Sequence, residues 1–176
     1  MAVMRHILAV AVLAAVAACA PTPSIRTVGD AGALDVRDIQ VDANRLDLVI
    51  KGRQLERSRA QLKQDVTAAL EAELRPVSVK DGTPVVVAVE LVDLHLANTA
   101  ERFVAQTSHV TTMVSVTEIG TGRVVVPATE VSGNTDNFRA IGVVGAATTL
   151  SVEEDYRGAL RGYAKTVRAA LFGSDQ

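Results

Sequence analysis

The sequence contains one cysteine, no tryptophan and three histidines, and aromatic residues make up only 3% of its 176 residues. A single cysteine cannot form an intramolecular disulfide, so the fold does not depend on such a bond. Surfaces that stack on sugars or nucleic-acid bases usually carry several aromatic rings. The shortage of rings therefore argues against sugar or nucleic-acid binding.

The sequence also lacks an excess of charge of either sign. Its 18 Lys and Arg residues are set against 20 Asp and Glu residues, which gives a formal net charge of -2. No basic stripe is present, which argues further against nucleic acid as a partner. Hydrophobic residues make up 48% of the chain, and its length suits one domain with an ordinary core.

Residues 1–18 have the three zones of a bacterial export signal. A short basic start includes Arg5, an unbroken apolar run spans residues 7–18, and small residues lead to Cys19. A secretory signal has an apolar run of about 7–15 residues, whereas a membrane-spanning helix needs about 20. Pro21 closes the run soon after the cysteine. The sequence therefore predicts a cleaved signal peptide over residues 1–18.

The cysteine itself follows Val16, Ala17 and Ala18. This pattern resembles the bacterial lipobox, in which an aliphatic residue and two small residues directly precede a cysteine. The resemblance implies lipid on the Cys19 sulfur, cleavage after Ala18, and acylation of the new amine by a fatty acid such as palmitate. One acyl chain binds a membrane only marginally, whereas several chains bind stably. The alternative is a secreted protein with an unpaired cysteine, which would itself need an explanation.

The residue after Cys19 bears on which membrane holds the protein. Ala20 stands where lipoproteins retained in the inner membrane often carry aspartate. The resemblance therefore implies an outer-membrane anchor with the domain in the periplasm, and the periplasmic face of the inner membrane stays an alternative. Residues 19–33, rich in Pro, Thr, Ser, Gly and Ala, are interpreted as a flexible tether. Residues 34–176 are interpreted as a single domain.

The first part of this domain is predicted to contain a strand and a long helix. Apolar and polar residues alternate over residues 34–41 with one slip of phase near Asp38, which predicts a bulged strand. Apolar residues then recur at helical spacing over residues 55–74, and Pro76 ends the helix. The residues that share the apolar face are Leu62, Val66, Leu70 and Leu74.

The second part is predicted to contain three strands and a helix. Residues 85–96 begin with an apolar stretch typical of a central strand covered on both sides. Residues 103–119 and 123–131 are β-branched runs on either side of Gly120-Thr121-Gly122, which predicts a hairpin. Ser151, with Glu154 three residues later, predicts a capping box at the start of the last helix.

This order predicts an α+β fold, a two-layer sandwich with two amphipathic helices on one face of an antiparallel or mixed sheet of about four strands. With the lipobox and tether, the outline resembles the small proteobacterial envelope lipoproteins. These include the auxiliary lipoproteins of ABC transport systems, the lipopolysaccharide-assembly lipoprotein and the YajG-like group. Only the lipobox is a specific motif, and architecture alone does not fix function.

Residue patterns for catalysis or metal binding are weak. His95 and His109 fall on separate predicted strands without a cysteine, whereas a zinc site needs three or four ligands. We interpret them as strand residues at a rim or solvent face. Glu90 and Asp93 are an odd number of residues apart, so a regular strand would point them to opposite faces. A G-x-S-x-G elbow and a phosphate-binding loop are absent. We expect no metal, no cofactor and no enzymatic activity.

The final helix combines an apolar face with a cationic one. Tyr156 and Tyr163 share a face with Leu160, so we expect them in the core with their hydroxyls at its edge. The cationic face is interpreted as solvated, with anionic head groups or an acidic partner as the alternative. Its residues are Arg157, Arg161, Lys165 and Arg168.

Residues 138–150 are apolar but rich in glycine and alanine. One interpretation is a buried segment of the core, because apolar segments are usually buried. The other is an exposed loop that contacts a partner or the membrane interface. The candidate partner-contact residues are Ile141, Gly142, Val143, Val144 and Gly145.

These observations favour a non-enzymatic accessory or structural subunit of an envelope or transport complex. Its expected partners are the membrane, through the lipid on Cys19, and a protein of the envelope. The alternative function is a periplasmic binding module for a lipid or small apolar ligand.

The predicted lipid attachment can be tested by changing its acceptor. Cys19→Ala should abolish incorporation of a labelled fatty acid and leave the uncleaved precursor, because acylation of the sulfur precedes cleavage in the lipobox family. Metabolic labelling of cells that produce either form measures this. Equal label on wild type and variant would show that Cys19 carries no lipid.

Overall fold

A computed structural model describes residues 33–46, 51–53, 55–103, 106–135 and 151–173. The elements, in chain order, are β1 (Leu34–Asp42), β2 (Lys51–Gly52), α1 (Arg59–Leu74), the 3-10 helix η1 (Arg75–Val77), β3 (Thr83–Leu96), α2 (Thr99–Phe103), β4 (His109–Glu118), β5 (Val124–Asn134) and α4 (Val152–Phe172).

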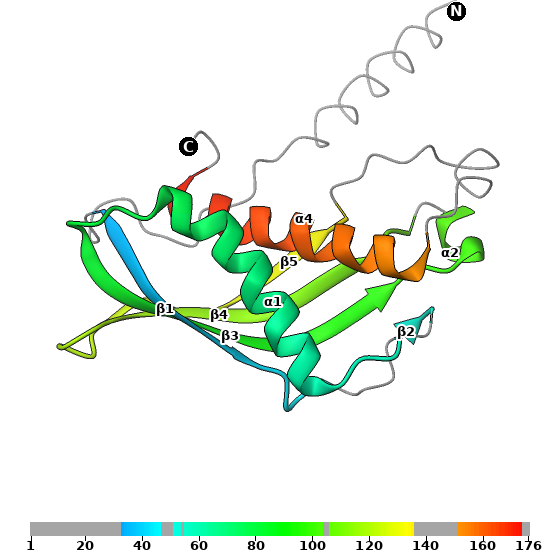
Figure 1. Ribbon diagram of the computed structural model, residues 1–176, viewed down its shortest axis with the longest axis horizontal. Helices are drawn as coiled ribbons and strands as arrows, with labels where there is room; N and C mark the ends of the chain where they lie inside the picture. Colours follow the sequence, from blue (N-terminus) through cyan, green and yellow to red (C-terminus); the bar gives the residue numbers. More distant parts are fainter. Residues whose placement is uncertain (1–32, 47–50, 54, 104–105, 136–150, 174–176) are drawn as a thin grey trace, which may run out of the picture.

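The strands form one mixed sheet in the order β1-β3-β4-β5, and the two-residue β2 pairs with the end of β3. β1 is parallel to β3, whereas β3–β4 and β4–β5 are antiparallel. The helices α1 and α4 both lie on one face of this sheet (Figure 1). The predicted α+β fold, with two amphipathic helices on one side of a sheet of about four strands, is confirmed.

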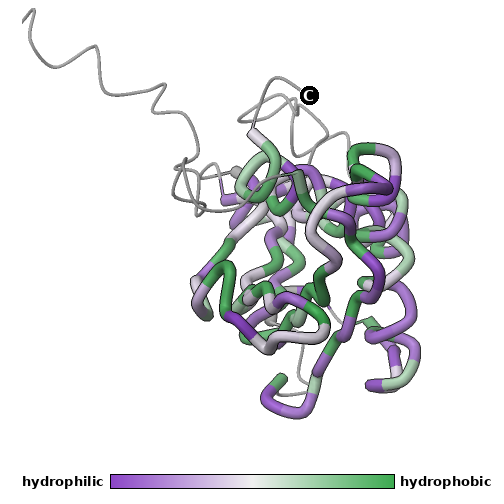
Figure 2. Tube along the Cα trace, turned by 90° about the vertical axis from the view of Figure 1, so that its left-hand side faces the viewer, coloured by the Kyte–Doolittle hydropathy of each residue, from purple (hydrophilic) through white to green (hydrophobic). Residues whose placement is uncertain are grey.

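The core fills the space between the sheet and the two helices. The predicted apolar face of α1 is confirmed, because Leu62, Val66, Leu70 and Leu74 are all fully buried. Hydrophobic and hydrophilic residues alternate along much of the chain (Figure 2), as expected for strands and helices covered on one side. At Gly133 of β5, a Cβ atom would lie 2.3 Å from the Cα atom of Tyr163. Glycine therefore lets α4 approach the sheet closely.

The ends of both long helices are capped as their sequences indicate. Ser58 and Gln61 form a capping box before α1, and Ser151 and Glu154 form the predicted one before α4. Because Ser58 is the N-cap, α1 begins at Arg59 and not near Leu55 as predicted. None of the described helices is long and apolar enough to span a membrane.

Bulges shift the phase of two strands. The slip predicted near Asp38 is confirmed as a shift in register between Val36 and Asp38 of β1. A second shift lies between Leu91 and Asp93 of β3. The extra residue, Val92, turns Asp93 to the side of the sheet that Glu90 occupies. The prediction that Glu90 and Asp93 point to opposite faces was therefore wrong.

The prediction that both sides of β3 are covered was also wrong. Val85, Val87 and Val89 are buried under the helices, but Val86 and Ala88 are only half-buried on the other side. We call this side, which α1 and α4 leave uncovered, the open face. The open face of β3 carries small and apolar residues, so the sequence of β3 resembles that of a strand buried on both sides.

Replacing a core leucine of α1 should destabilise the domain much more than replacing an exposed neighbour. Leu70→Ala should lower the free energy of unfolding by about 2–5 kcal/mol, because it leaves a cavity under the helix. Gln64→Ala, at an exposed position of the same helix, should change it by about 0.5 kcal/mol or less. Urea unfolding of a soluble form that starts after Cys19 measures both. Equal effects would mean that the buried face of α1 is misassigned.

Candidate functional site

Two of the predicted sites lie outside the described residues. Cys19, with most of the tether, precedes the first described residue, and residues 141–145 fall between β5 and α4. Lipid attachment at Cys19 and partner contact at residues 141–145 therefore stay predictions.

The sheet brings the two histidines together on the open face. His95 on β3 is the register partner of His109 on β4. Their rings are stacked, with centroids 5.2 Å apart and an interplanar angle of 22°. The Nε2 atom of His95 lies 3.1 Å from a carboxylate oxygen of Glu101, and Nε2 of His109 lies 3.4 Å from one of Asp93. Each imidazole is thus engaged by its own carboxylate.

This group of four side chains is a cross-strand polar cluster at the end of the sheet. Within the described part of the chain, no three His, Cys, Asp or Glu side chains are arranged to hold a metal ion. The interpretation of His95 and His109 as strand residues near a rim agrees with their positions. Their stacking could not be predicted, because it depends on the register of β3 against β4.

A second cluster is buried where α4 begins. Asp155 is fully buried and forms an ion pair with Arg102 of α2, which is 7% exposed. Ser108 Oγ donates a hydrogen bond to the same carboxylate at 2.6 Å. Arg102 also donates from Nε to the carbonyl of Ala97 at 3.0 Å. The cluster therefore joins the first turn of α4 to the segment that connects β3 with β4.

We interpret the Asp155 cluster as structural. A buried ion pair needs further hydrogen bonds to its charged groups. Here Ser108 donates to Asp155, Arg102 donates to the carbonyl of Ala97, and Arg53 lies 3.8 Å from the same carboxylate. The sequence did not reveal it, because Asp155 follows Glu153 and Glu154 and matches the acidic first turn of an exposed helix.

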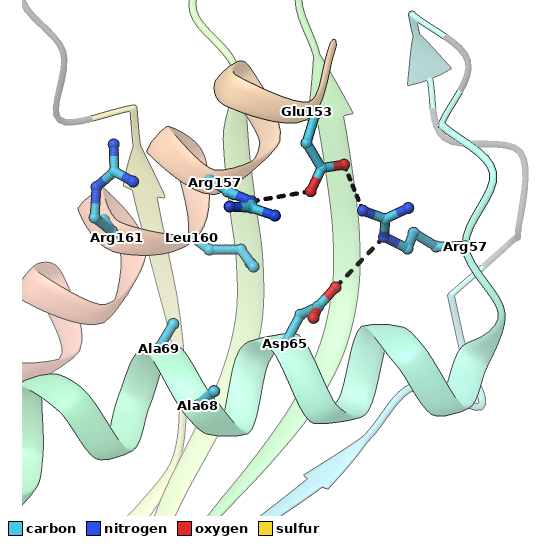
Figure 3. A pocket seen from close by; sticks show the side chains of 8 residues that line it. All are labelled: Arg57, Asp65, Ala68, Ala69, Glu153, Arg157, Leu160 and Arg161. Atoms are coloured by element: carbon cyan, nitrogen blue, oxygen red, sulfur yellow. Dashed lines mark hydrogen bonds and ion pairs between the residues drawn. The ribbon is translucent and has the colours of Figure 1, made fainter. Parts of the chain in front are cut away.

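A groove of about 280 Å³ runs between α1 and α4 (Figure 3). Arg57 forms ion pairs with Glu153 and, at 3.5 Å, with Asp65, and Glu153 also binds Arg157 at 2.9 Å. The lining residues are Arg57, Asp65, Ala68, Ala69, Glu153, Arg157, Leu160 and Arg161. Farther along α4, Arg168 lies 3.6 Å from Glu73 of α1. Carboxylates of the two helices therefore already engage part of the cationic face of α4.

The two tyrosines of α4 lie in the core, as predicted, but their hydroxyls differ. Tyr156 donates to Asp65 at 2.9 Å at the edge of the groove, whereas the fully buried Tyr163 bonds Thr112 at 2.8 Å inside the core. Burial, reinforced by the hydrogen bond to Asp65, raises the pKa of Tyr156, and burial raises the pKa of Tyr163. The prediction of a hydroxyl at the core edge was wrong for Tyr163, because Thr112 provides a partner inside.

The open face carries the larger hollow, of about 570 Å³. Its middle is lined by small or unbranched side chains from three strands: Ala88 of β3, Met113 and Ser115 of β4, and Ala128 of β5. Asp42 and Glu90 lie at its side. Arg45 binds Glu90 at 2.9 Å, and Lys63 of α1 lies 3.6 Å from Asp42. The hollow is a shallow surface with a charged rim.

No protein-family model and no curated protein matches the chain. Among solved structures, a Caulobacter crescentus CB15 protein described as a candidate lipoprotein aligns with a TM-score of 0.33 at 15% identity, over 74% of this chain and 84% of its own. A Xanthomonas campestris protein of the DUF330 family aligns with a TM-score of 0.33 at 11% identity, over 85% of this chain and 94% of its own. Similarities at this level do not establish a shared fold or function.

Breaking the buried ion pair should be costly. Asp155→Asn leaves Arg102 buried without its counter-ion and should destabilise the domain by about 3–5 kcal/mol. Glu153→Gln, which affects only partly exposed ion pairs on the same turn, should cost about 1 kcal/mol or less. Denaturant unfolding of both variants measures the difference. A cost below about 1 kcal/mol for Asp155→Asn would show that the cluster contributes little to stability.

Proposed function

We propose that the protein is an envelope lipoprotein, held in the outer membrane by lipid on Cys19, whose periplasmic domain acts as a non-enzymatic accessory or structural subunit of an envelope or transport complex. The observation that carries this proposal is the sequence Val16-Ala17-Ala18-Cys19 at the end of a signal-like apolar run.

The distance between the anchor and the domain is compatible with docking on a membrane complex. The first strand, β1, begins at Leu34. At about 3.3–3.6 Å per residue, residues 19–33 can span at most about 50 Å. The domain can therefore reach partners near the membrane without its own surface having to bind lipid.

The roles of the charged side chains support a non-enzymatic function. Asp155, Arg102 and Ser108 bind one another in the core, and Arg57 links α1 to α4 through Asp65 and Glu153. Catalysis needs a nucleophile or a general base directed at a site that a substrate can reach. The ionisable groups described above are instead used to join one element to another.

The shapes of the two hollows favour docking over the transport of an apolar ligand. Sites for small apolar ligands bury most of the ligand in a largely hydrophobic pocket. The α1–α4 groove and the hollow on the open face are both open to solvent and have charged residues in their walls. Such surfaces suit contact with another protein.

Purification of the full-length chain from detergent-solubilised membranes tests the proposal. With a C-terminal affinity tag, we expect a stoichiometric envelope protein in the eluate, identified by mass spectrometry, and no enrichment of a particular lipid. A lipid bound in stoichiometric amount without any protein would contradict the accessory role and support the ligand-binding alternative.

The control for this experiment separates the anchor from the domain. Residues 1–33, fused to an unrelated periplasmic domain, carry the same signal, lipid and tether. A partner of the folded domain should be absent from the control eluate. A protein found equally with both baits binds only the lipidated segment and does not support the proposal.

A further inference from the structure

The open face of the sheet is acidic. Asp38 and Asp42 of β1 and Glu90 of β3 alternate onto it, and the bulge at Val92 adds Asp93. Glu130 of β5, the register partner of Met113, supplies a fifth carboxylate. Asp42 and Glu90 line the hollow, and the other three carboxylates lie on the same side of the sheet outside its lining.

Cations on the described part of this face are few. The strands β3, β4 and β5 contain no lysine or arginine. The single arginine of β1, Arg37, binds Asp35 at 2.5 Å. Arg45 and Lys63 reach Glu90 and Asp42 from outside the sheet. Asp93 is engaged by His109 at 3.4 Å, so the negative charge of the open face rests mainly on Asp38 and Glu130.

The middle of the open face differs from an ordinary solvated sheet. Such a sheet face usually carries polar residues at alternate positions. Here Val86, Ala88, Met113 and Ala128 take such positions. Ala88, Met113 and Ala128 line the hollow of about 570 Å³, together with polar residues such as Ser115. Met113 is unbranched and adaptable, a property common on surfaces that bind other proteins. An apolar centre with a polar rim is the usual anatomy of a protein interface.

We propose that the open face is the docking surface of this accessory protein, and that it binds a basic segment of a partner protein, with an apolar side chain over Met113 and Lys or Arg side chains opposite the carboxylates. This inference rests on the proposed accessory function. A basic protein segment is the occupant we infer, because its positive charge is complementary to the negative charge of the open face. Anionic head groups would be repelled by the five carboxylates, and so would the open face of a second copy.

Site-specific photo-crosslinking in living cells tests this proposal with the full-length, membrane-anchored chain. A benzophenone amino acid replaces Met113 at the centre of the open face or, as the matched control, Gln64 on the exposed side of α1. We expect a discrete adduct with another protein from position 113 and at least tenfold less from position 64. The partner peptide in the adduct, mapped by mass spectrometry, should carry net positive charge.

Variants that reverse the charge of the open face provide a second test. Asp38→Lys with Glu130→Lys, in the chain that carries the crosslinker at 113, should lower the adduct yield at least tenfold. Asp81→Lys, an exposed change in the turn before β3, should leave it unchanged. If the double reversal disturbs folding, Asp38→Asn with Glu130→Gln removes the charges without reversing them and should still lower the yield severalfold.

Several outcomes would overturn the inference. They are an adduct with a second copy of the chain, an adduct with lipid, an adduct of equal yield from position 64, or an adduct insensitive to both sets of charge changes. No adduct from position 113, when a protein partner still co-purifies with the domain, places docking elsewhere and leaves the accessory function standing. Absence of both adduct and co-purified partner rejects the accessory function itself.

Discussion

The burial of one side of a mixed sheet under α1 and α4 is the constraint on which the rest of the structure depends. Most large apolar side chains of the strands point to the helices, because the described residues form no second layer on the other side. Leu70 of α1, Tyr163 of α4, Val87 and Val114 all belong to the resulting core. The open face is then limited to polar, small or half-buried residues, and its acidic rim and apolar centre can exist because nothing in the described fold covers them.

Buried polar contacts fix how α4 sits on the sheet. Apolar packing is not directional, so it does not by itself define the position of a helix along its axis. The Asp155–Arg102 pair holds the start of α4 against α2, and the Tyr163–Thr112 hydrogen bond holds its middle against β4. Gly133 sets how closely α4 approaches β5. These contacts lie on the covered side, which leaves the open face free for a different role.

The fold could be predicted from local patterns, whereas the sites depend on contacts between distant residues. Helical spacing identified the buried face of α1, and the Ser151–Glu154 pair identified the start of α4, because both signals lie within a few residues. The bulge at Val92 left no such signal, so the relation between Glu90 and Asp93 was misjudged. The His95–His109 stack and the Asp155–Arg102 pair need strand register and helix placement. The apolar run of β3 wrongly predicted that both of its sides are covered, because alanine and valine occur on buried and half-buried sides alike.

Whether the open face acts beside a membrane depends on the lipid at Cys19. Intact-mass spectrometry of the protein extracted from bacterial membranes measures this in one experiment. We expect a chain that begins at Cys19 and carries the added mass of a diacylglyceryl group on sulfur and a fatty acyl group on the amine. A mass equal to the unmodified chain, with residues 1–18 present or removed, would contradict the lipoprotein assignment and with it the proposed place of the domain in the envelope.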